Sequence, residues 1–276
     1  MRWTPPNPEL FDRFVAFARE QVTSWDIDPT YPVLRYVYER EGLSEEIRLW
    51  RTLLYVTLYH LGSAEILWQR APTRGSVPPE IFKGLPTGIE RRGFRGRPRL
   101  AAESINGVLE AAEGNLTRWV GEATQPEGEA GWSGVRATFQ AVKYQGSWAS
   151  YKWADLLKWA HGYPITASDL GVGGGGETAG PIPGLVKLTG LDWKTCAKDN
   201  ELQRAVLTEA NAKGAGLNGL DQLETALCDF NSHLKGRYYV GHDIDMQAEQ
   251  LRSCGPALWE ARAVVLPARY LKERRR

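Results

Sequence analysis

The sequence predicts an all-helical protein, and two observations carry this prediction. Apolar residues recur at helical spacing along most of the chain, and no stretch shows the alternation of apolar and polar residues that is typical of a strand. The 276 residues, of which 42% are hydrophobic, suffice for one large domain or two small ones with a buried core. No apolar run could span a bilayer and no signal-peptide core is present, so we expect a cytoplasmic protein without a membrane partner.

Helices are expected in the first half wherever an apolar stripe follows a start signal. The first helix begins at Asn7 or Pro8, and the second ends at Gly42. Ser44 is expected to cap a longer helix that runs to about Ile66, with two glutamates in its first turn. Further helices are predicted over 100–120, 131–143 and 147–160.

The second half begins with a segment that is rich in glycine. Residues 171–184, GVGGGGETAGPIPG, contain too much glycine and proline for a helix or a regular strand. This run would mark a seam between two helical lobes. We expect an N-terminal helical region over 1–70 and a catalytic region over 71–276, unless they form one continuous domain. Helices are predicted after the run over 199–213, 221–235, 242–252 and 256–264.

Cysteine usage and charge exclude several classes of site. Cys196, Cys228 and Cys254 are far apart and form no CxxC pair, so neither a zinc site nor a disulfide framework is predicted. The net charge is only +1, so any contact with nucleic acid must come from a local patch. Eleven tryptophans either build the core or include a few that stack on bases.

A local basic patch is present in the loop that is predicted over 71–99. The segment ERRGFRGRPR carries five arginines within nine positions, and guanidinium groups suit phosphate oxygens. The alternative is a solvated loop that is partly paired to Glu90. We expect Arg91, Arg92 and Arg95 to lie near the reacting group and Arg97 and Arg99 to contact DNA.

Residues 142–169, VKYQGSWASYKWADLLKWAHGYPITASD, resemble the helix–hairpin–helix of DNA glycosylases. In that motif the backbone N–H groups of the hairpin hold a DNA phosphate, and an aspartate follows the second helix. The resemblance implies a glycosylase-like helical bundle in which Asp169 occupies the place of the catalytic aspartate. It also implies a DNA-contacting turn, formed by Lys143, Gln145, Gly146 and Ser147.

The chain departs from the glycosylases in ways that indicate a derived group. Its turn, KYQGS, holds one glycine where glycosylases carry Gly-x-Gly, the lysine of the lyases is absent, and a glycine run follows Asp169. Over roughly residues 85–236 the chain resembles the alpha-glutamyl/putrescinyl thymine pyrophosphorylases of phages, also described as amino-acid:DNA transferases. The matching segments are GSWASYKWADL with Tyr151 and Asp155, SDLGVGGGGETAG, and LETALCDFNSHLK with Glu224.

This resemblance implies a reaction and its partners. The substrate would be 5-hydroxymethyluracil in DNA that carries a diphosphate on its 5-methylene, and an amino acid or polyamine would displace pyrophosphate. Such an enzyme works on an extruded base, in the host cytoplasm if a phage encodes it. We expect no cofactor, although the diphosphate leaves room for a magnesium ion.

Two carboxylates are candidates for the catalytic group. Asp169 would stand beside the cationic methylene or accept the proton of the amine; alternatively it caps a turn with Thr166. Asp155 lies in an otherwise apolar helix, where a carboxylate should be paired or functional. A salt bridge from Lys152 or Lys158 is an equally good interpretation.

The glycine run is the predicted cradle for diphosphate. Its consecutive backbone N–H groups can face a phosphate, and a nearby hydroxyl can add a contact, although a surface loop is the commoner meaning of such a run. The residues concerned are Gly173, Gly174, Gly175, Gly176 and Thr178, together with Tyr151 on the preceding helix. Two other functions stay open: a glycosylase that hydrolyses the N-glycosidic bond, and a helical DNA-binding protein without chemistry.

Overall fold

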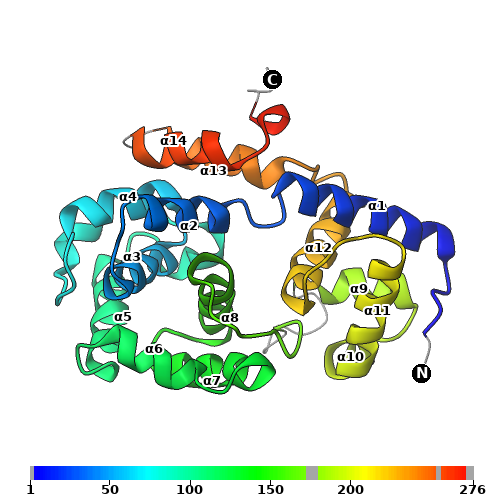
Figure 1. Ribbon diagram of the computed structural model, residues 1–276, viewed down its shortest axis with the longest axis horizontal. Helices are drawn as coiled ribbons and strands as arrows, with labels where there is room; N and C mark the ends of the chain where they lie inside the picture. Colours follow the sequence, from blue (N-terminus) through cyan, green and yellow to red (C-terminus); the bar gives the residue numbers. More distant parts are fainter. Residues whose placement is uncertain (1–2, 172–179, 253–255, 272–276) are drawn as a thin grey trace. The chain divides into compact units, whose positions relative to one another are not determined.

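The computed structural model describes residues 3–171, 180–252 and 256–271 (Figure 1). Every regular element in these ranges is a helix, and the β-type pairing found there is a single isolated bridge between Gly128 and Ile165. The predicted all-helical fold is therefore confirmed. In this part of the chain no helix is both long and apolar enough to cross a membrane.

The chain divides into two compact units, and each is assembled from separate stretches of sequence. Unit 1 comprises Met1–Pro29, Thr166–Asp245 and Leu266–Arg276. Unit 2 comprises Thr30–Ile165 and Met246–Val265. The boundary that the sequence predicts after residue 70 falls inside unit 2.

Unit 1 is built around α1 and α12, whose aromatic side chains meet in its core. Phe14 and Phe17 of α1 both contact the ring of Phe230, with centroids 5.4 and 5.5 Å apart. The side chain of Asn7 caps α1 and Pro8 opens it, as the sequence predicts. The helices of unit 1 are α1 (Pro8–Ser24), α9 (Ile182–Thr189), α10 (Trp193–Lys198), α11 (Asn200–Ala212), α12 (Leu220–His233) and the short η5 (Ala268–Tyr270).

Unit 2 surrounds α3, which packs against α4, α5, α6 and α8. Its Leu49, Leu53 and Leu54 are fully buried, which makes α3 the centre of this core. The other elements are α2 (Thr30–Arg40), α3 (Glu45–Leu58), α4 (Leu61–Arg70), η1 (Pro79–Phe82), η2 (Ile89–Phe94), α5 (Pro98–Ala111), α6 (Leu116–Thr124), α7 (Gly128–Gln140), α8 (Ser147–Leu156), η3 (Leu157–His161) and α14 (Pro256–Val265). The remaining helix, α13 (His242–Leu251), runs from unit 1 into unit 2.

The expectation of one long helix from Ser44 to Ile66 is wrong. Tyr59 adopts a left-handed backbone with φ of 47° and ends α3, after which the His60 side chain accepts a hydrogen bond from the Ser63 amide and caps α4. Ser44 is the N-cap residue of α3, but its side chain makes no capping hydrogen bond. The apolar stripe continues through the break because both helices bury their faces in the same core.

Two further boundaries differ from the prediction. The helix expected over 100–120 is interrupted where Gly114 takes a φ of +71° and Asn115 caps α6. The segment 171–184 was expected to contain no helix, yet α9 begins at Ile182. Pro183 is tolerated there because the first turn of a helix leaves its N–H groups without intrahelical partners.

Candidate active site

Helices α7 and α8 pack against each other and are joined by a short turn over residues 141–146, in the place where the sequence predicts a hairpin. Tyr144 adopts a left-handed backbone in this turn, and Gly146 precedes α8. The side chain of Gln145 is fully buried and donates to Ser104 Oγ at 2.9 Å. Gln145 could therefore contact DNA only through its backbone, whereas Gly146 is exposed and Ser147 half-buried.

Asp155 lies on α8 with only 2% of its surface exposed. Its carboxylate accepts a hydrogen bond from Lys152 Nζ at 3.0 Å, so the ion pair considered from the sequence is present. The hydroxyl of Tyr31, on α2, lies 3.4 Å from the same carboxylate oxygen. A buried carboxylate held by an ammonium and a phenol is a compensated charge, which is the state in which burial is tolerated.

Aromatic side chains connect Asp155 to the arginine segment. The hydroxyls of Tyr31 and Tyr59 lie 3.4 Å apart. The Tyr59 ring meets the ring of Trp148 edge-on at 4.8 Å. Trp148 in turn lies 5.7 Å from the guanidinium carbon of Arg91. The structure thus brings Asp155 and Arg91, which are predicted from distant parts of the sequence, to the two ends of one aromatic array in unit 2.

Arg91 is the one arginine of its segment that is buried, with 8% of its surface exposed. Its guanidinium lies over the Phe94 ring at 4.3 Å, and its Nε donates to the carbonyl oxygen of Thr57 at 3.1 Å. Its Nη2 is buried and has no hydrogen-bond partner among the described residues. Burial lowers the pKa of Arg91 to about 10, which leaves it a cation at neutral pH. A buried guanidinium with a free N–H donor can bind an anion through a charge-assisted hydrogen bond.

The position of Arg91 depends on close contact between η2 and the end of α3. The amide of Gly88 donates to the carbonyl oxygen of Leu58 at 2.8 Å. A Cβ atom at Gly88 would collide with the carbonyl oxygen of Tyr59. Glycine is required here because the two backbones approach more closely than any side chain allows.

Tyr151 is also buried on α8 and faces aromatic and cationic groups. Its ring meets that of Trp132 edge-on at 5.2 Å. The guanidinium carbon of Arg136 lies 5.5 Å from its centre and Lys152 Nζ lies 5.7 Å away. Lys152 thus contacts both Tyr151 and Asp155. The two residues of α8 on which the family resemblance rests therefore lie in one cluster.

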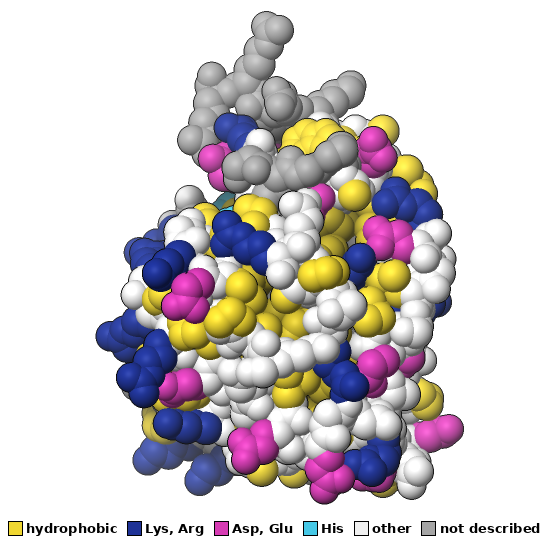
Figure 2. Space-filling model, turned by 90° about the vertical axis from the view of Figure 1, so that its left-hand side faces the viewer, with side chains coloured by type: hydrophobic (Ala, Val, Ile, Leu, Met, Phe, Trp, Pro, Cys, Tyr) yellow, Lys and Arg dark blue, Asp and Glu magenta, His cyan; other side chains and the backbone are white. Residues whose placement is uncertain are grey.

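The residues that are predicted to contact DNA come together partly around Glu103 of α5. Its carboxylate accepts from Arg99 Nε at 2.8 Å and from the Tyr144 hydroxyl at 3.0 Å, and Lys143 Nζ lies 3.9 Å away. Arg92, Arg95 and Arg97 are exposed. Figure 2 shows Lys and Arg side chains gathered along one edge of the face that it presents, with some acidic side chains among them. The turn before α8 and the start of α5 therefore share a basic surface.

Asp169 belongs to unit 1, whereas Asp155 belongs to unit 2. The Asp169 carboxylate accepts hydrogen bonds from the Gly171 amide at 2.5 Å and from Ser168 Oγ at 3.1 Å. A side-chain bond to the amide two positions on is the Asx turn that aspartate favours in loops. The glycines Gly173, Gly174, Gly175 and Gly176, and Thr178, lie outside the described residues.

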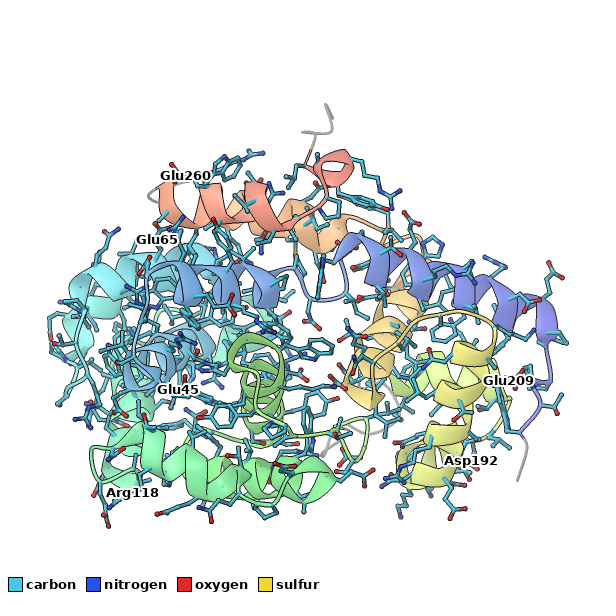
Figure 3. The ribbon with its side chains drawn as sticks, in the orientation of Figure 1. Glu45, Glu65, Arg118, Asp192, Glu209 and Glu260 are labelled. Carbon is cyan, nitrogen blue, oxygen red and sulfur yellow. The ribbon has the colours of Figure 1, made fainter. Side chains whose placement is uncertain are left out.

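A second array in unit 2 has the residue types of a catalytic triad but a structural role. His161 Nδ1 donates to Glu45 at 2.8 Å, and its Nε2 lies 2.9 Å from Thr52 Oγ1. The Thr52 hydroxyl also forms a hydrogen bond with the Tyr38 hydroxyl. Both residues are fully buried, so no substrate reaches the Thr52 hydroxyl. Glu45, labelled in Figure 3, opens α3, so the array fastens the start of α3 to the end of η3.

The family-like motif on α12 lies beside a buried acidic network in unit 1. Asp229 accepts from Gln21 at 2.8 Å. Asp26 accepts from the Tyr238 hydroxyl at 2.9 Å and from backbone amides that include those of Asp243 and Ile244, both at 3.0 Å. Burial and the charge of Asp243 raise the pKa of Asp26. Since its oxygens satisfy the amides at the start of α13, Asp26 acts as a helix cap supplied from a distant part of the chain.

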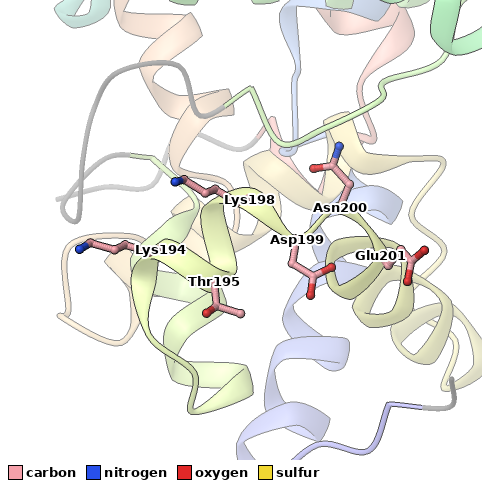
Figure 4. A pocket seen from close by; sticks show the side chains of 6 residues that line it. All are labelled: Lys194, Thr195, Lys198, Asp199, Asn200 and Glu201. Carbon is pink, nitrogen blue, oxygen red and sulfur yellow. The ribbon is translucent and has the colours of Figure 1, made fainter.

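A wide depression lies between α10 and α11 in unit 1, with a volume of about 600 Å³. Figure 4 shows Lys194 and Lys198 extending together to one side of it and Asp199 and Glu201 lying on the other. The side chain of Asp199 caps α11 by accepting from the Leu202 amide. The surface is open and carries both signs of charge, so it offers no selective site.

Several neighbours of the predicted residues could not be identified from the sequence. Tyr31 and Tyr59 reach the site because α2 packs against η3 and because α3 ends at a left-handed residue. Trp148 is one of eleven tryptophans, and nothing in its spacing separates it from those in the core. For Lys152 a signal did exist, since it stands three positions before Asp155.

The comparison with known families agrees with the part of the chain that carries these groups. A family model described as amino acid:DNA transferase matches residues 88–239. The match begins at Gly88, the glycine that lets η2 approach the end of α3. It includes Arg91, Asp155 and Asp169. It covers more than half of the 276 residues. The chain therefore belongs to the amino acid:DNA transferase family.

Proposed function

We propose that the protein hypermodifies thymine in DNA, by placing an amine where 5-(diphosphooxymethyl)uracil carries its diphosphate. The amine is an amino acid or a polyamine. The observation that carries the proposal is the buried Arg91, whose Nη2 has no hydrogen-bond partner in the described residues. This guanidinium lies beside aromatic rings, and the chain belongs to a family of DNA transferases.

The reaction breaks one bond and forms another. The bond between the 5-methylene carbon and the diphosphate oxygen breaks, and pyrophosphate leaves with the electron pair while the uracil ring stabilises the cationic methylene. The amine nitrogen then forms the new carbon–nitrogen bond and loses a proton to a base. Arg91, with the exposed Arg92 and Arg95 beside it, would stabilise the negative charge that develops on the leaving group.

The carboxylates have separate proposed roles. Asp155 would balance positive charge on the methylene, with Lys152 and Tyr31 fixing its orientation. Asp169 would accept the proton of the amine, a role that rests on its resemblance to the glycosylase aspartate. Tyr151 would contact the substrate beside Asp155. A diphosphate cradle formed by residues 173–176 and Thr178 stays a prediction from the sequence.

DNA binding is proposed for the basic surface around Glu103. Arg99 and Lys143 share this carboxylate, and Arg97 is exposed at the start of α5. The backbone of the turn over 145–147 would add contacts to phosphate. Trp148 is half-buried next to Arg91, so its ring is a candidate surface for stacking an extruded base.

Product analysis tests the proposal directly. DNA that carries the diphosphate base is incubated with individual amino acids or putrescine, and both pyrophosphate and the modified nucleoside are measured. We expect wild-type protein to release pyrophosphate and to form the aminated base. Asp169→Asn should abolish transfer with nearly unchanged DNA affinity, and Asp12→Asn, an exposed control on α1, should remain active.

Other outcomes would favour the alternatives. Release of a free base would indicate a glycosylase, and binding without either product would indicate a DNA-binding protein. Full activity of Asp169→Asn would remove Asp169 from the mechanism. Loss of activity in Arg91→Lys with intact folding would support diphosphate binding, since lysine cannot provide the planar fork of arginine.

A further inference from the structure

Unit 2 contains a pocket that shares no residue with the Arg91–Asp155 array. It lies among α2, α3, α4 and α14 and has a volume of about 160 Å³. A cavity of about 150 Å³ accommodates a molecule of the size of benzene, so roughly six non-hydrogen atoms fit. Val37, Trp68 and Leu258 provide apolar walls.

The polar feature of this pocket is Glu65 of α4, which Figure 3 labels near α14. Only 5% of its surface is exposed, and its carboxylate has no hydrogen-bond or ion-pair partner among the described residues. Its Oε2 is completely enclosed. A buried carboxylate that lacks both a cation and a donor is costly, and a bound cation would remove this cost.

The other charges of the pocket do not compensate Glu65. Arg51 is 2.7 Å from Glu41 and its guanidinium lies over Trp68. Arg40 also lies 3.8 Å from Glu41. Burial and the negative charge of Glu41 raise the pKa of Glu65 to about 6, so it is ionised above neutral pH. Both arginines lie against Glu41, and no cation of the described residues is within ion-pair distance of Glu65, so a ligand can neutralise this carboxylate.

We propose that this pocket binds a small alkylammonium ion, with the ammonium group on Glu65 and the hydrocarbon stem against Val37, Trp68 and Leu258. A single positive charge matches the uncompensated carboxylate. A zwitterion would bring a carboxylate close to Glu41 and Glu65 and fits less well. This site shares no residue with the Arg91–Asp155 array, so binding to it is measured without DNA and its failure would leave the proposed transferase activity untouched.

Calorimetric titration of the full chain with n-butylammonium chloride at pH 8 tests the proposal, with 1-butanol as the uncharged analogue. We expect saturable binding of butylammonium, and much weaker binding of butanol. Glu65→Gln should weaken butylammonium binding about tenfold or more, since a charge-assisted hydrogen bond is lost. Glu39→Gln, an exposed carboxylate on α2, should bind as wild type.

A second variant guards against a folding defect in the first. Ala257→Phe fills the pocket from α14 and leaves Glu65 in place, and it too should weaken binding. The unfolding temperature of Glu65→Gln should be at least as high as that of wild type, because the substitution removes a buried charge that has no partner. The proposal is overturned if wild type shows no saturable binding at millimolar butylammonium, if butanol binds equally well, or if Glu65→Gln retains wild-type affinity.

Discussion

Two charged residues of unit 2, Arg91 and Asp155, are buried, and their partners decide what each can bind. Arg91 and Asp155 are opposite charges at the two ends of an aromatic array, and each is almost completely buried. Asp155 is compensated by Lys152 at 3.0 Å, whereas Arg91 keeps Nη2 without a partner in the described part of the chain. The arginine is therefore the residue that is prepared for an anionic ligand. Its position depends on Gly88, which lets η2 contact the end of α3.

Gly88→Ala tests this dependence. The new methyl group would collide with the Tyr59 carbonyl and push η2 away from α3, so we expect a loss of about 1–3 kcal/mol in the free energy of unfolding. Transfer activity should fall further than stability alone explains, because Arg91 moves with η2. Gly93→Ala is the matched control, because Gly93 lies in η2, which Gly88 precedes, and has open space around it. Equal stability and activity of both variants in urea unfolding and product assays would refute this role.

Single helices are held at their ends by side chains from elsewhere in the sequence. Asp26 satisfies amides at the start of α13, and Glu46 accepts hydrogen bonds from the Leu116 and Thr117 amides at the start of α6. Glu45 binds His161 and Tyr163 after η3. The contacts of Asp26 and Glu46 set helix boundaries, because they satisfy amide donors that a helix terminus leaves open.

Glu45 makes the stability of the protein depend on pH. Burial by itself would raise its pKa, but the hydrogen bond and charge of His161 and the bond from Tyr163 lower it below its usual range. A carboxyl with a lowered pKa stabilises the folded state above its unfolded pKa, about 4.3, and this contribution is lost as the pH falls through the folded value.

Glu45→Gln should therefore be less stable than wild type near pH 6, and the difference should shrink as the pH falls below about 4. Thermal unfolding of both proteins across this range measures it. Glu9→Gln provides the control, since Glu9 is an exposed glutamate in the first turn of α1. A difference that stays constant with pH would contradict the proposed contribution of Glu45.

At the scale of the whole molecule, the small net charge of +1 means that DNA affinity must come from local surfaces. The structure groups Arg99 and Lys143 around Glu103, close to the exposed Arg97 at the start of α5. The family match extends through residues of both units.

The salt dependence of DNA binding measures the number of phosphate contacts on this surface. Arg97→Ala and Lys143→Ala should each reduce the slope of log affinity against log salt by about 0.9 if each side chain neutralises one phosphate. Arg35→Ala, an exposed arginine on α2 that is paired with Glu39, should leave the slope unchanged. Unchanged slopes for the first two variants would show that this surface does not contact DNA.

The sequence by itself determined the helical class, the family resemblance and the residue types of the site, because periodicity and local motifs are properties of neighbouring positions. Asn7 and Pro8 at the start of α1 and the Lys152–Asp155 pair follow from such local rules. Only the tertiary structure decided that α3 ends at Tyr59, that Arg91 alone of its segment is buried, and that Tyr31 reaches Asp155. These features arise from contacts between residues far apart in the chain, and their energies depend on packing that no local pattern encodes.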